Sequence, residues 1–205
     1  MTSLIMTAWL ALATAAISPG PNLVAVASRA LGSGRNSALT VAAGLASGAF
    51  LWSFLTAVGL GTLFAAYPVL LRIMGLFGGA YLLWLGFKGW RAALTGKGGQ
   101  IAPVAGRGMR RDFLHGLTVT STNPKVALLW ASLSTFVGPA ITDWSHLLLF
   151  TTGSAVIIFA IYGTYGWLFS TGRARGLYKR FQRASEAVFG TLFGGLGLFM
   201  MNRAA

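Results

Sequence analysis

Two short segments decide how this chain folds: Ser18-Pro19-Gly20-Pro21-Asn22 and Ser121-Thr122-Asn123-Pro124-Lys125. Each interrupts an apolar stretch long enough to cross a bilayer, residues 4–28 and residues 113–137. Proline removes a backbone donor and clashes with the preceding helical turn, and glycine adds conformational freedom. We therefore predict that each stretch is a helix with a break in it.

The composition on either side of these segments is that of a membrane protein. Of the 205 residues, 55% are hydrophobic and only 9% are charged, and the mean hydropathy is +0.69. So little polar sequence cannot cover a soluble globule, and disordered chains contain far fewer apolar residues. Six spans of about 20 residues would leave only short loops, so we predict an all-α integral membrane protein with a single transmembrane domain over 1–205. The six predicted transmembrane helices cover residues 4–28, 38–65, 69–87, 113–137, 147–169 and 184–201.

The net charge of +13 is concentrated in alternate loops. The first, third and fifth loops hold thirteen of the sixteen Lys and Arg residues, and by the positive-inside rule these loops face the cytoplasm and both termini face outward. The basic linker 95–111 lacks the aromatic residues on which nucleic-acid bases stack, so we expect it to meet the lipid bilayer and no nucleic acid. Because it is rich in glycine, we also expect it to be flexible. The thirteen residues are Arg29, Arg35, Lys88, Arg91, Lys97, Arg107, Arg110, Arg111, Arg173, Arg175, Lys179, Arg180 and Arg183.

Few residues of the chain suit catalysis or metal binding. It has no Cys, two His and three acidic residues, which leaves little from which to build a disulfide, a metal site or a hydrolytic centre. Lys125 with Ser18 or Ser121 would make a Ser-Lys pair, but no acid supports it. We therefore predict neither an enzyme nor a cofactor.

The two broken helices are placed symmetrically in the chain. Pro21 and Pro124 are 103 residues apart, so each opens a three-helix half, about residues 1–95 and 108–205. Three spans is an odd number, so the second half must cross the membrane in the opposite sense. The sequence thus predicts two inverted repeats with broken helices 1 and 4, an architecture in which transporters bind substrate at the breaks.

The residues at the breaks suggest what they bind. Asn123-Pro124 has the order of an N-cap followed by the first helical residue, and Ser18-Pro19 offers the same start in the first span. A restarted helix presents free N–H groups that suit a carboxylate, and Asn22 can donate and accept hydrogen bonds. Lys125 is the only basic residue well inside a span, where it must face a cavity, a partner or a substrate. The predicted translocation site comprises Ser18, Pro19, Gly20, Pro21, Asn22, Ser121, Thr122, Asn123, Pro124, Lys125 and, deeper in the third span, Tyr81.

A passive channel is the alternative to a transporter. Two Asn-Pro elements in inverted halves also build aquaporin-like pores for small solutes. Against this, the first segment reads Pro21-Asn22, in the reverse order, and Lys125 would stand in the pore.

Taken together, these motifs resemble the LysE/RhtB superfamily of lysine and threonine exporters. The resemblance spans nearly the whole chain and includes Ser18–Asn22, Gly78-Gly79-Ala80-Tyr81-Leu82 and Asn123-Pro124-Lys125. It implies a proton-driven secondary transporter that exports amino acids or related small metabolites across the bacterial inner membrane. On this likeness the Pro and Asn residues of both breaks, with Lys125, would line the translocation site.

The resemblance leaves the coupling ion and the assembly open. Many members carry an Asp in the second span where this chain has Gly48-Ala49-Phe50, and no acid lies deep in a predicted span. Asp112 is expected at a cytoplasmic span end and Asp143 in an outer loop. Members are often dimeric, and the Gly44-x-x-x-Gly48 spacing fits either a homodimer face or packing within one bundle.

Overall fold

The structure is a computed structural model in which helices form every element of the described residues. These residues are 2–18, 20–60, 66–96, 101–137, 141, 143–171, 176, 183–184, 186–188, 190–191, 193–195, 197–198 and 201–202. The chain forms two compact units, one made of Met1–Thr62 with Ile101–Ala174 and the other of Leu63–Gln100 with Arg175–Ala205.

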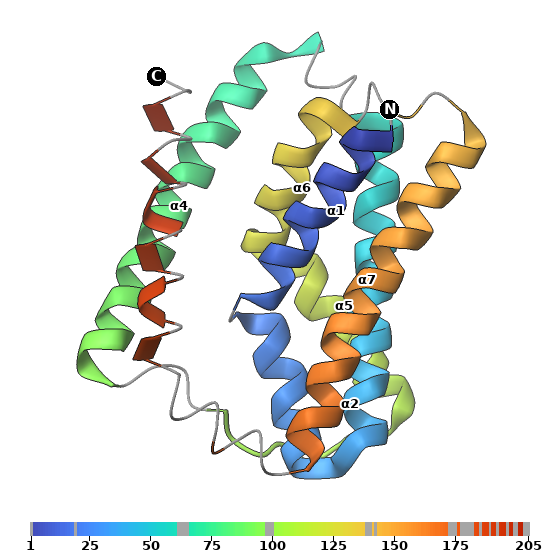
Figure 1. Cartoon of the computed structure of the whole chain (residues 1–205), viewed down its shortest axis with the longest axis vertical. Helices are drawn as coiled ribbons and strands as arrows, with labels where there is room; N and C mark the ends of the chain where they lie inside the picture. The colour runs from blue at the N-terminus through green and yellow to red at the C-terminus, as the bar shows by residue number, and fades with distance from the viewer. Residues whose placement is uncertain are drawn as a thin grey trace. The chain divides into compact units, whose positions relative to one another are not determined.

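The first unit is a helical bundle with α2 at its centre (Figure 1). Helix α2 packs most extensively against α7 and α5, and α1 packs against α7 and α6. The bundle consists of α1 (Thr2–Ile17), α2 (Pro21–Leu55), the π-helical turn η1 (Thr56–Leu60), α5 (Met109–Thr122), α6 (Pro124–Val137) and α7 (Trp144–Ser170).

Both predicted breaks are present, and proline accounts for each. Helix α5 ends at Thr122, and Asn123 after it is extended at φ −78° and ψ 110°, because the residue before a proline avoids the helical region. Helix α1 ends at Ile17, and α2 begins at Pro21, where a missing N–H costs nothing. The prediction of a helix start at Ser18-Pro19 was therefore wrong, since the new helix begins after Gly20.

Helix α2 is bent sharply at Gly34. This residue has φ 78° and ψ −172°, a positive φ that favours glycine, and it divides α2 into two helical parts. The loop expected between the first and second spans is thus a single-residue kink.

Glycines bring α2 and α5 into backbone contact. A Cβ added to Gly44 would meet the Phe113 carbonyl and, at 2.8 Å, the Leu117 nitrogen, and one added to Gly116 would meet the Val41 carbonyl. The Gly44-x-x-x-Gly48 spacing therefore serves packing within the bundle.

In the second unit, helix α4 (Pro68–Thr95) packs against described residues of the C-terminal segment. A Cβ at Gly86 would lie 2.8 Å from the Gly194 nitrogen, and α4 ends at Gly96 with a left-handed φ of 67°. Tyr81 lies in α4, and its side chain falls outside the described part of the chain.

Several described helices are suited to lipid. Pro21–Gly59 and Trp144–Ser170 are long and apolar enough to cross a membrane, whereas Ser3–Ile17 and Lys125–Ser134 are shorter apolar helices. Each of the two shorter helices lies next to one of the breaks. Large apolar side chains are exposed on the outside of the bundle, as in a protein that faces lipid. They include Met6, Leu10, Ile17, Leu51, Leu148, Leu149, Val156 and Phe159.

Candidate functional site

The two helix breaks meet inside the first unit. The Asn123 side-chain amide donates a hydrogen bond of 3.1 Å to Asn22 Oδ1, and the Asn22 amide donates one of 3.5 Å to Thr120 Oγ1. Both asparagines are 5% exposed. Residues 101 positions apart in the sequence thus share one buried polar contact.

Lys125 joins the second break to the end of α1. Its ammonium donates to the Ala15 carbonyl at 2.9 Å, to the Ser18 carbonyl at 3.4 Å and to the Ser18 hydroxyl. The last carbonyls of a helix lack partners within it and carry partial negative charge. Lys125 therefore satisfies the open end of α1 from a helix more than a hundred residues later.

Asn123 also caps α6, as the Asn-Pro order predicts. Its Oδ1 accepts the Lys125 backbone N–H at 3.0 Å, and its carbonyl accepts the N–H groups of Val126 and Ala127. The first break differs, because Gly20 precedes α2 without a side-chain cap. Ser18, expected to be a cap, instead binds Lys125.

A narrow cavity opens at this junction. The space open to the centres of water molecules is about 30 Å³, enough for roughly two waters and too small for an amino acid. Predicted site residues Ser18, Gly20, Asn22, Asn123 and Lys125 line it.

The remaining predicted site residues either do not line the cavity or fall outside the described residues. Three of them, Pro21, Ser121 and Thr122, are exposed and do not line the cavity. Ser121 and Thr122 follow the buried Thr120 on α5, and the rotation of the helix turns their side chains away from the interior. Pro19 and the side chain of Pro124 fall outside the described residues, as does that of Tyr81. For these three the role remains a prediction.

The structure adds wall residues that sequence reasoning missed. Thr120 lies in the last turn of α5, three residues before Asn123, so helical periodicity could have suggested it. Trp130 and Tyr162 gave no such signal, because only the packing of α6 and α7 brings them to the breaks. The additional lining residues are Leu12, Ala15, Ala16, Ala49, Thr120, Val126, Leu129, Trp130, Ile158 and Tyr162.

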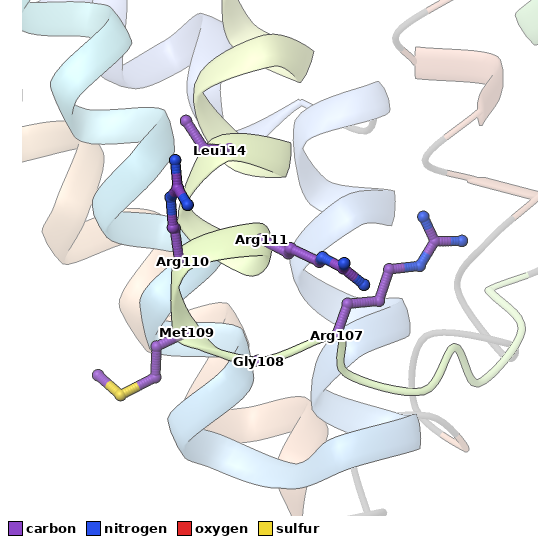
Figure 2. Close-up of a pocket in the computed structure, with 6 residues that line it drawn as sticks. All are labelled: Arg107, Gly108, Met109, Arg110, Arg111 and Leu114. Atoms are coloured by element: carbon purple, nitrogen blue, oxygen red, sulfur yellow. The ribbon is translucent and has the colours of Figure 1, made fainter.

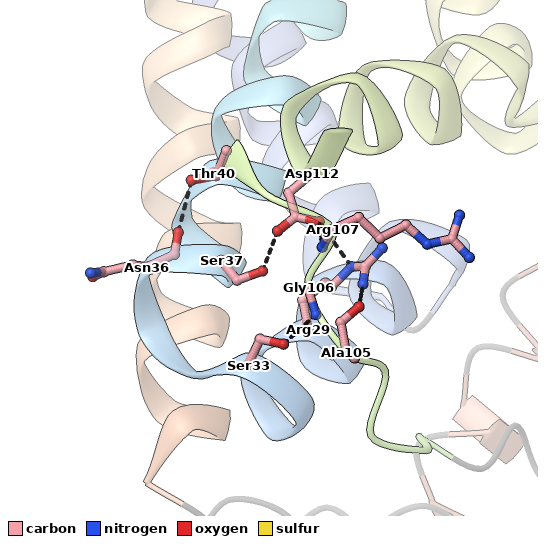
Figure 3. A network of polar contacts seen from close by, with 9 residues as sticks. All are labelled: Arg29, Ser33, Asn36, Ser37, Thr40, Ala105, Gly106, Arg107 and Asp112. Atoms are coloured by element: carbon pink, nitrogen blue, oxygen red, sulfur yellow. Dashed lines mark hydrogen bonds and ion pairs between the residues drawn. The ribbon is translucent and has the colours of Figure 1, made fainter. Parts of the chain in front are cut away.

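A second buried polar cluster lies where α2 approaches the start of α5 (Figure 3). Arg29 Nε lies 3.3 Å from Asp112 Oδ1, and both side chains are almost fully buried. Ser37 donates its hydroxyl hydrogen to Asp112 Oδ2, and the Arg107 backbone N–H donates to Oδ1 at 3.2 Å. Asp112, expected at an interfacial span end, is therefore a buried and fully engaged carboxylate.

The linker before α5 is fixed to α2, contrary to the expectation of flexibility for this part. The Val104 N–H donates to the Ser28 carbonyl at 3.0 Å, and the Gly106 N–H donates to the Ser33 hydroxyl. Arg29 donates to the Ala105 carbonyl. We call residues 101–108 the strap, because these contacts tie it to the part of α2 that precedes the Gly34 kink.

An open basic groove of about 430 Å³ lies at the beginning of α5 (Figure 2). Its three guanidinium groups point in different directions and do not converge on one point. Such a basic surface suits contact with anionic lipid headgroups. The groove is lined by Arg107, Gly108, Met109, Arg110, Arg111 and Leu114.

Apolar outer faces around a buried polar junction of broken helices define an all-α membrane protein with an internal site. The chain belongs to the LysE family, since the model of the LysE type translocator matches residues 13–203. The resemblance seen in the sequence motifs is thereby confirmed.

Several relatives of the chain are named for export. It is 30% identical over 178 residues to the homoserine/homoserine lactone efflux protein of Salmonella typhimurium, covering 86% of this chain and 85% of the relative. It is 29% identical over 199 residues to the threonine efflux protein of Escherichia coli (strain K12), covering 91% and 92%. An uncharacterized membrane protein of Haemophilus influenzae is 27% identical over 180 residues, covering 86% of each chain. No solved structure matches the chain.

Proposed function

We propose that this protein is a secondary transporter that exports amino acids or related small metabolites across the bacterial inner membrane. The observation that carries the proposal is the junction of the two breaks, where Asn22, Asn123 and Lys125 converge on a buried cavity. Membership of the LysE family and the relatives named as threonine and homoserine efflux proteins support the substrate class.

The contacts of Lys125 suit exchange with a zwitterion. A substrate carboxylate can take the Lys125 ammonium from the Ala15 carbonyl, and the α6 N-terminus adds positive potential. The substrate ammonium can then donate to the α1 carbonyls that Lys125 has left. The carboxylate and the ammonium of the amino acid would thus together replace the contact between Lys125 and the end of α1. Neither Lys125 nor the α1 carbonyls would be left without a partner.

Loading requires the cavity to widen. Since about 30 Å³ admits only roughly two waters, α1 and α6 must separate at their breaks before an amino acid enters. The breaks are suitable hinges, because no continuous helix crosses them. This fits alternating access around a fixed site.

The same proposal includes six spans in two inverted halves, with the basic loops in the cytoplasm and both termini outside. In that topology the strap and the Arg29–Asp112 pair close the cytoplasmic end of the bundle, and they must release for an exporter to load. The proton gradient is the proposed driving force. Asp112 is the buried carboxylate among the three acids, so it is the group to test for coupling.

Flux measurements on reconstituted vesicles test the function. The purified protein should catalyse counterflow of radiolabelled threonine or homoserine that saturates with concentration and accelerates under an imposed proton gradient. A passive channel would instead give rapid, non-saturating osmotic swelling. Absence of flux for every amino acid tried would refute the exporter proposal.

A further inference from the structure

Trp130 stands out among the cavity residues because its polar atom is unused. The side chain is 1% exposed and lines the cavity, yet Nε1 meets no acceptor anywhere in the described part of the chain. Buried donors in native proteins nearly always have a partner, and an exception needs an explanation.

Packing accounts for the ring of Trp130 but not for its nitrogen. The indole meets Phe150 edge to face, with centroids 6.1 Å apart and an interplanar angle of 81°. A phenylalanine could make such a contact equally well, without burying an unpaired N–H. The unpaired Nε1–H would therefore be satisfied if a bound ligand supplied the hydrogen-bond acceptor.

The position of Trp130 suits the far end of a small substrate. It follows Lys125 by five residues on α6, a rise of about 7.5 Å along the helix. Because both side chains line the same cavity, a small substrate held at Lys125 can reach Trp130 with its side chain. The nearby wall residues Val126, Leu129 and Ile158 carry no polar side-chain atoms.

The other polar groups of the cavity already have partners. Thr120 accepts from Asn22, Asn123 donates to Asn22, and the Tyr162 hydroxyl interacts with Asn22. Lys125 is held by the end of α1. Among the described residues that line the cavity, Trp130 is thus the side chain whose polar atom has no hydrogen-bond partner at all.

We propose that the Trp130 indole N–H donates a hydrogen bond to an oxygen in the side chain of the transported substrate, and so makes the protein select amino acids with such an acceptor. This inference rests on the proposed export function and adds a specificity-determining residue to it.

The test compares ligands that differ by one hydroxyl group. Threonine and homoserine each contain one hydroxyl more than 2-aminobutyrate, which has the same number of carbons. For the wild-type protein in vesicles, we expect the hydroxylated pair to inhibit the counterflow of radiolabelled threonine about tenfold more strongly than 2-aminobutyrate does. In Trp130→Phe, which keeps an aromatic ring and loses the donor, that ratio should fall to about twofold or less, because the hydroxylated ligands lose their additional hydrogen bond.

A matched control removes another unpaired buried polar group. Thr56 lies in η1, is fully buried, has an unpaired hydroxyl in the described structure and does not line the cavity. Thr56→Val should keep the wild-type ratio.

The possible results distinguish a failure of the proposed role of Trp130 from a failure of the proposed export function. Flux in the wild type with no preference for a hydroxyl group overturns the role of Trp130, even if the Phe variant fails to fold. The same holds if Trp130→Phe keeps the full preference. Absence of all amino-acid flux in the wild type instead overturns the exporter itself.

Discussion

Arg29 and Asp112 form a buried ion pair, 3.3 Å from Nε to Oδ1, with side chains only 4% and 2% exposed. The pair joins the first part of α2 to the first turn of α5, and the Arg29 guanidinium also holds the strap through the Ala105 carbonyl. Each of the two charged side chains can therefore be buried only because the other neutralises it.

Removing one partner of this pair should destabilise the protein strongly. Arg29→Met or Asp112→Leu leaves an uncompensated buried charge, which costs about 3–5 kcal/mol. The double variant should lose less than the sum of the two single changes, because no lone charge remains. The free energy of unfolding in detergent should be measured for the two single variants and the double variant. The control is Arg110→Met, which removes an exposed arginine. Additive losses would show that the two side chains are not coupled.

Locking the strap should stop export. The chain has no cysteine, and a Cβ on Gly106 would lie 3.2 Å from the Ser33 Cβ, slightly closer than the roughly 3.5–4.5 Å of a disulfide, so a small outward shift of the strap admits one. The double variant Ser33→Cys with Gly106→Cys should lose counterflow on oxidation and regain it with a reductant. Each single variant should be insensitive to oxidation. Full counterflow by the cross-linked protein would mean that the strap does not open during transport.

A methyl group between α2 and α5 should be poorly tolerated. Gly44→Ala forces the Phe113 carbonyl and the Leu117 nitrogen away, and overpacking of this kind costs about 1–3 kcal/mol. Gly163→Ala on α7 is the matched control, since its nearest neighbour, Leu39, would lie at an ordinary 3.5 Å. Alanine is a better helix former than glycine, so the control should unfold at the same or a higher temperature. The reverse order of stability would contradict the packing described.

The start of α7 should depend on pH. Asp143 accepts the Ser145 hydroxyl hydrogen at 2.6 Å and the His146 backbone N–H at 2.9 Å, and these bonds lower the pKa of its carboxyl group. A lowered pKa stabilises the folded state above the unfolded pKa of about 3.9, and this contribution is lost as the pH falls further. The stability advantage of the wild type over Asp143→Ala should thus shrink as the pH falls below about 4. A difference independent of pH would contradict the cap.

Local chemistry made part of this structure predictable. The break at Asn123 follows from the residue geometry before Pro124, and the Asn cap follows from side-chain reach over two residues. At the first break two prolines compete, and the sequence alone placed the helix start two residues too early.

Long-range packing made the rest unpredictable. The burial of Asp112 depends on Arg29, 83 residues earlier, so its place near the end of a span suggested an interfacial acid. The strap is rich in glycine, yet hydrogen bonds to α2 hold it. Trp130 reaches the cavity only because α6 packs beside the other helices of the bundle.

The central claim, that the two breaks form the substrate site, is tested most directly at Lys125. Counterflow of threonine should be measured for Lys125→Ala and for Lys88→Ala, which removes an exposed lysine that lies over the Trp84 ring in α4. We expect Lys125→Ala to abolish counterflow while the folded protein persists in size-exclusion chromatography, and Lys88→Ala to retain it. Counterflow by folded Lys125→Ala at the wild-type rate would contradict the account.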